Sequence, residues 1–169
     1  MKKYLIIILA FSFVSNASAQ EDAVAKYMAK YIQSEDFEHT YVSNRMFSAI
    51  LKSNANEISP NIRELMKDIK GMRQLSTKKE NKKYFDEFAQ TFESKGFQNV
   101  LTIRRGNERI NMYMKNENKP DGELIMLIQE SNSFNLTSFN GNINLDNMST
   151  ISNALNIKGA EYIKQARKR

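Results

Sequence analysis

The chain of 169 residues has a formal net charge of +6, with 41% hydrophobic and 26% charged residues, which is the balance of a globular protein. This length favours a single compact domain. The absence of Cys excludes disulfides, thiolate metal sites and cysteine nucleophiles, and the single His, His39, excludes multi-histidine metal sites.

The first nineteen residues have the three parts of a secretory signal peptide. A basic start is followed by an apolar run over residues 4–14, and Ala17 and Ala19 precede Gln20 at the positions typical of a cleavage site. The run is too short for a membrane span, which needs about 20 apolar residues. We predict a signal peptide over residues 1–19, cleavage between Ala19 and Gln20, and export to the periplasm. Without Cys, no lipid anchor is expected, and loss of Lys2 and Lys3 lowers the formal charge to +4.

The expected mature chain has three parts. A helical arm covers residues 20–37, a single α+β domain covers residues 38–157, and a basic tail covers residues 158–169. Val24, Met28 and Tyr31 fall on one face of the arm's amphipathic helix. The sequence leaves open whether this helix packs against the domain or moves freely.

Hydrophobic periodicity and turn residues predict the elements of the domain. The first part has a strand over 38–42, a helix capped by Ser43 or Asn44, a loop and helix-entry signal over 54–61 with Ser59-Pro60, a strand over 68–75, and a helix over 78–95 ended by Gly96. The second part has strands over 97–105, 108–114, 123–130 and 134–139, a turn or bulge at Asn140–Gly141, and a helix from Asp146. Short turns join the last four strands into an antiparallel meander, and the most hydrophobic of them, over 123–130, is expected at the centre. The predicted fold class is therefore α+β, a single antiparallel-rich sheet of this meander plus one or two N-terminal strands, with helices packed on one face.

Four short motifs occur in a fixed order behind the signal peptide. They are Val42-Ser43-x-x-Met46-Phe47, Ile69-Lys70-Gly71-Met72, the run GELIML over 122–127, and Gly141-x-Ile143-x-Leu145-Asp146-x-Met148-Ser149. Together, over residues 38–155, they resemble the exported Bacteroidota family known as domain of unknown function 4252. The resemblance implies no established activity and carries over no catalytic residues, but it does imply a link to envelope stress. Many members look like lipoproteins, and this chain departs from them because it lacks the lipobox Cys.

The residues form no complete catalytic or metal-binding motif. His39 is the only imidazole for a triad, and no Ser stands in a G-x-S-x-G motif. The stretch Asn140–Asp146 resembles a calcium loop, but its Gly is at the second position and Ile151 stands where the closing Glu belongs, so helix capping explains it better. We expect no cofactor and no metal.

Two basic groups are candidates for contact with an anionic surface or an acidic partner. Arg104, Arg105 and Arg109 flank the Gly106-Asn107 turn and are expected to project together, and Lys164, Arg167, Lys168 and Arg169 form the tail. The tail has little apolar content and is expected to fray. A solvated surface that keeps the protein soluble is the other interpretation of both groups.

The sequence favours an exported, non-catalytic binding or interaction protein of the cell envelope. Its expected partner is an envelope protein or an anionic surface, and neither nucleic acid nor a membrane span after cleavage is expected. Two alternatives stay open. One is a periplasmic enzyme with a carboxylate or Ser–Lys site, and the other is a structural subunit that assembles, for example as a homo-oligomer, through a sheet edge.

Overall fold

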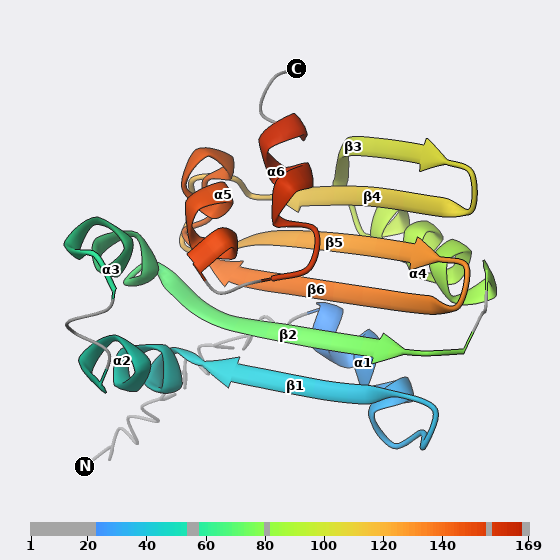
Figure 1. Ribbon diagram of the computed structural model, residues 1–169, viewed down its shortest axis with the longest axis horizontal. Helices are drawn as coiled ribbons and strands as arrows, with labels where there is room; N and C mark the ends of the chain where they lie inside the picture. The colour runs from blue at the N-terminus through green and yellow to red at the C-terminus, as the bar shows by residue number, and fades with distance from the viewer. Residues whose placement is uncertain (1–22, 54–57, 80–81, 155–156, 167–169) are drawn as a thin grey trace, which may run out of the picture.

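The sheet has six antiparallel strands in the order β1-β2-β6-β5-β4-β3 (Figure 1). The computed structural model describes residues 23–53, 58–79, 82–154 and 157–166. The strands are β1 (Glu38–Ser43), β2 (Ile69–Thr77), β3 (Gln98–Arg105), β4 (Glu108–Lys115), β5 (Gly122–Glu130) and β6 (Ser133–Gly141). The predicted α+β class is confirmed: β3–β6 form the meander, two N-terminal strands extend it, and β5 lies at the centre.

Helices cover both faces of this sheet, so the prediction that they pack on one face is wrong in that detail. The helices are α1 (Ala23–Ile32), α2 (Asn44–Ser53), α3 (Pro60–Met66), α4 (Lys82–Ser94), α5 (Leu145–Ala154) and α6 (Ala160–Ala166). Helices α1 and α4 pack on one face, called here the α4 face, and α5 and α6 pack on the opposite α6 face (Figure 1). Helices α2 and α3 lie at the ends of β1 and β2 and contribute Phe47 and Met66 to the core of the α6 face.

The reason for two covered faces lies in the central strand. Leu124, Met126 and Ile128 of β5 belong to the core of the α6 face. Ile125 and Leu127, which alternate with them, belong to the core of the α4 face. Successive side chains of a strand point to opposite faces, so an unbroken apolar run needs cover on both sides.

Local sequence signals set several element ends. The Ser59 hydroxyl accepts a hydrogen bond from the amide of Ile62 and caps α3, and the Ser43 hydroxyl accepts one from the amide of Met46 at the start of α2. Gly96 ends α4 with a φ of +80°, a conformation that glycine adopts without strain. The predicted turn or bulge at Asn140–Gly141 is a register shift between β6 and β2, where Lys70 is the extra residue.

Helix α1 packs against the sheet, which decides between the two alternatives for the arm. Val24 and Met28 are fully buried in the core of the α4 face. Two polar side chains of α1 bind the carboxylate of Glu87 in α4. Tyr27 Oη and Lys30 Nζ donate hydrogen bonds to Glu87 Oε1 at 2.8 and 2.6 Å. These hydrogen bonds, above all that from Lys30, lower the pKa of Glu87 to about 2.

The predicted basic tail over residues 158–169 contains a helix, α6, so the expectation that it frays from Lys164 onward is wrong for residues 164–166. Ala160, Ile163 and Ala166 recur at the spacing of one helix face, and all three are buried on the sheet. None of the described helices is long and apolar enough to span a bilayer. The expected signal peptide lies outside the described residues.

Candidate functional site

A groove of about 520 Å³ lies where the start of β1, the end of β2 and the β5–β6 turn meet. Phe37 and Phe134 contribute its apolar surface, and Ser76, Ser133 and Asn135 contribute polar groups. Its rim carries charges of both signs, which are acidic at Glu35, Asp36 and Glu38 and basic at Lys78, Lys79 and Lys158. Strand pairing brings these distant segments together, since Glu38 faces Ser76 in β2, and Ser76 faces Asn135 in β6.

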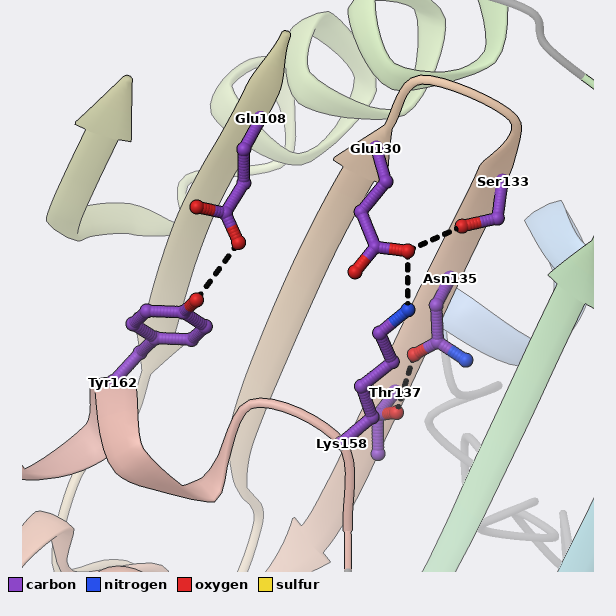
Figure 2. Close-up of polar contacts among 7 residues, drawn as sticks. All are labelled: Glu108, Glu130, Ser133, Asn135, Thr137, Lys158 and Tyr162. Carbon is purple, nitrogen blue, oxygen red and sulfur yellow. Dashed lines mark hydrogen bonds and ion pairs between the residues drawn. The ribbon is translucent and has the colours of Figure 1, made fainter. Parts of the chain in front are cut away.

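Asn135 is a buried polar side chain that lines this groove, at 6% exposure. Its carboxamide oxygen accepts a hydrogen bond from Thr137 Oγ1 at 3.0 Å. Its nitrogen is turned away from Thr137 (Figure 2) and donates to no group in the described part of the chain. Since this nitrogen has no acceptor among the described residues, it is available as a donor to a ligand or to water in the groove.

Glu130 holds one side of the groove together. Its Oε2 atom accepts hydrogen bonds from Lys158 Nζ and from the Ser133 hydroxyl, both at 2.7 Å (Figure 2). These contacts lower the pKa of Glu130, with the bond from Lys158 as the largest cause. Since a carboxylate that is held ionised is a weak base, this constellation does not activate Ser133 as a nucleophile.

Helix α6 is tied to the same face of the sheet by a second polar contact. The Tyr162 hydroxyl donates to Glu108 Oε1 at 2.8 Å (Figure 2). Burial and this bond raise the pKa of Tyr162 to about 12. The contact of Lys158 with β5 therefore holds the residues just before α6, and the contact of Tyr162 with β4 holds the first turn of α6.

The three arginines around the Gly106-Asn107 turn do not project together. Arg104 and Arg109 face each other on β3 and β4, and the Arg109 guanidinium lies 4.2 Å from the centre of the Phe85 ring of α4. Arg105 alternates with Arg104 and points to the α6 face, opposite Glu108. Arg109 also donates to Asp86 Oδ1 at 2.6 Å, so it is not a free surface cation.

The other predicted site residues are further apart. Lys164 is exposed on the last turn of α6. Arg167, Lys168 and Arg169, like the cleavage site at Ala19 and Gln20, lie outside the described residues. The predicted contact of both basic groups with an anionic surface stays a prediction.

Sequence reasoning missed the groove because its residues come from four separate segments. The only local signal is the polar side of β6, where Asn135 and Thr137 alternate with buried Phe134 and Leu136. That alternation is typical of a strand with one solvated face, yet both polar residues are buried here.

When the chain is compared with known proteins, it matches the model of one protein family. The model described as domain of unknown function (DUF4252) matches residues 8–151. No curated protein and no solved structure matches the chain. The match covers most of the chain, and both the ordered motifs and all six strands of the sheet lie within the matched residues. The chain therefore belongs to the DUF4252 family.

Proposed function

We propose that the protein is an exported, non-catalytic binding protein of the cell envelope, and that its groove takes up a polar ligand. The observation that carries the proposal is the Asn135 nitrogen, a donor without a protein partner in the described residues, on a side chain that is 6% exposed and lines the 520 Å³ groove. Such a hollow with a few convergent polar groups is the usual form of a binding site.

The groove supports a ligand that carries both hydrogen-bond acceptors and charges of both signs. The Asn135 amide selects a carbonyl or hydroxyl oxygen. Glu35, Glu38 and Lys78 line the groove without an ion-pair partner among the residues described. A polar peptide segment has this chemistry, and its exposed charges would be matched at the rim.

Site-specific cross-linking in the producing cells tests the groove. A photoreactive residue replaces exposed Lys78 at the rim, and the control places it at exposed Lys67 beside α3. We expect a defined adduct from position 78 that position 67 does not give, and we expect Asn135→Leu to abolish it. Equal adducts from both positions, or an adduct that Asn135→Leu leaves intact, would contradict the proposal. Asn153→Leu, at an exposed position of α5, is the matched control substitution.

Export is tested separately by cell fractionation and intact-mass measurement. The sequence from Ala17 to Gln20 supports a soluble periplasmic chain that begins at Gln20. Recovery of the full 169-residue chain in the membrane fraction would overturn this part of the proposal.

A second candidate function is assembly through the β1 edge. Residues Glu38–Ser43 pair with β2 without a register shift, and no strand among the described residues lies on the other side of β1. The opposite edge, β3, is interrupted by a bulge between Asn99 and Leu101, a feature that protects edges from pairing. Sedimentation velocity would detect concentration-dependent dimers that Thr40→Pro abolishes, and a strict monomer at all concentrations would exclude this function.

A further inference from the structure

A second hollow, of about 300 Å³, lies on the α4 face beside the β3–β4 turn. Its side chains come from α4 (Asp86), β3 (Arg104), β4 (Arg109) and β5 (Gln129). It shares no lining residue with the groove described above. Three of its side chains lie in one row across the sheet, because Arg104 faces Arg109 and Arg109 faces Gln129.

The charges of this hollow are not balanced. Two guanidinium groups directly opposite each other on neighbouring strands repel. Asp86 compensates Arg109, with which it forms an ion pair at 2.6 Å, and the Phe85 ring supports the same guanidinium. Arg104 has no acceptor or anion in the described part of the chain, and its side chain is exposed at the mouth of the hollow. One positive charge is therefore left for an anionic group.

Gln129 is a second, independent sign of a ligand. Its side chain is 2% exposed, and its carboxamide oxygen is buried without a hydrogen-bond donor. An unpaired buried acceptor destabilises a protein, so it calls for an explanation. A bound molecule that brings an N–H group to this oxygen supplies one.

We propose that this hollow binds a free α-amino acid as a zwitterion. The Arg104 guanidinium receives the carboxylate, in the paired geometry that arginine and carboxylate favour. The ammonium group donates to the Gln129 oxygen and lies in the field of Asp86. An anion alone would leave Gln129 unpaired, and a cation alone would be repelled by Arg104. Both halves of the ligand are therefore required.

Chemical-shift titrations with three small probes test this proposal, since they register weak binding. L-Alanine carries both charges, propionate lacks the ammonium group, and L-alaninamide lacks the carboxylate. We expect L-alanine to bind at least about tenfold more tightly than either analogue, the factor that one charge-assisted hydrogen bond provides. The shifted signals should include those of Arg104 and Gln129.

Two substitutions and a control complete the test. Arg104→Gln should weaken L-alanine binding about tenfold or more, and Gln129→Met, which keeps the side-chain size, should weaken it by about fivefold. Arg105→Gln, one residue away on the opposite face, should leave binding unchanged. The proposal is overturned if L-alanine does not bind, if propionate binds as tightly, or if Arg105→Gln has the effect of Arg104→Gln. Thermal unfolding of each variant separates a lost contact from a lost fold.

Discussion

Ile163→Ala tests whether α6 is an integral part of the fold. Ile163 is fully buried, in the same core as Met126 and Ile151. Truncation of a buried isoleucine to alanine costs about 2–5 kcal/mol, because apolar contact is lost and a cavity remains. In a domain of this size each kcal/mol lowers the Tm by about 2–4 °C, so a loss of about 3 kcal/mol predicts a fall of about 6–12 °C.

The control for this prediction is the next residue of the chain. Lys164 is exposed on the same helix, so Lys164→Ala should change the Tm by about 1 °C or less. Both variants are measured by thermal unfolding followed by circular dichroism and by urea titration. If Ile163→Ala is as stable as Lys164→Ala, α6 does not pack on the sheet and the reasoning fails.

Three further perturbations follow from single contacts. The folded-state pKa of Glu87 is lowered from 4.5 to about 2, so its stabilising effect is complete above about pH 4.5 and is lost as the pH falls towards 2. Glu87→Gln should therefore be less stable than the wild type at pH 6, and the gap should close by pH 2 in urea titrations; a constant gap contradicts this. Gly159→Ala places a Cβ 2.6 Å from Ile128 Cδ1 at a φ of +88°, so we expect a loss of about 1–3 kcal/mol in the same assay, and an unchanged stability would show that the loop adapts. Finally, addition of a chelator should leave the Tm unchanged, and a fall of several degrees would reveal a metal site that we have missed.

The strands and most element ends could be predicted because their signals are local. Alternation in residues 108–114 and the turn residues Pro120 and Gly122 act within a few positions of the structure they specify. Gly96 and Ser59 likewise determine helix ends through their own backbone or hydroxyl. These features required no knowledge of tertiary contacts.

The faces of the sheet and the packing of α6 could not be predicted in the same way. An apolar run such as residues 124–128 indicates a central strand, but it does not say which helices return to which side. The segment after Gly159 looks too polar to pack, since Ile163 is its single large apolar residue before the basic end. Two alanines at the same spacing, Ala160 and Ala166, complete its buried face because small side chains let the helix approach closely.

The candidate sites were hidden for a different reason, which is sequence distance. The arginines were found because a turn places them close together along the chain, but strand alternation then divides them between two faces. Gln129 and Asp86 join Arg109 only through strand pairing and helix packing. No periodic pattern contains that information.

The balance between stability and function can be examined at Asn135. This residue lies in the second central strand of the sheet, opposite Ile128 of β5, and its side-chain oxygen accepts from the buried Thr137 hydroxyl. Asn135→Leu leaves that hydroxyl without its acceptor and should lower the free energy of unfolding by about 1–3 kcal/mol, whereas Asn135→Leu combined with Thr137→Val removes both partners and should restore most of the loss. Both variants should abolish capture at the groove. Capture that is lost in the destabilised single variant but returns in the double variant would show instead that Asn135 supports the fold through Thr137 and does not bind the ligand.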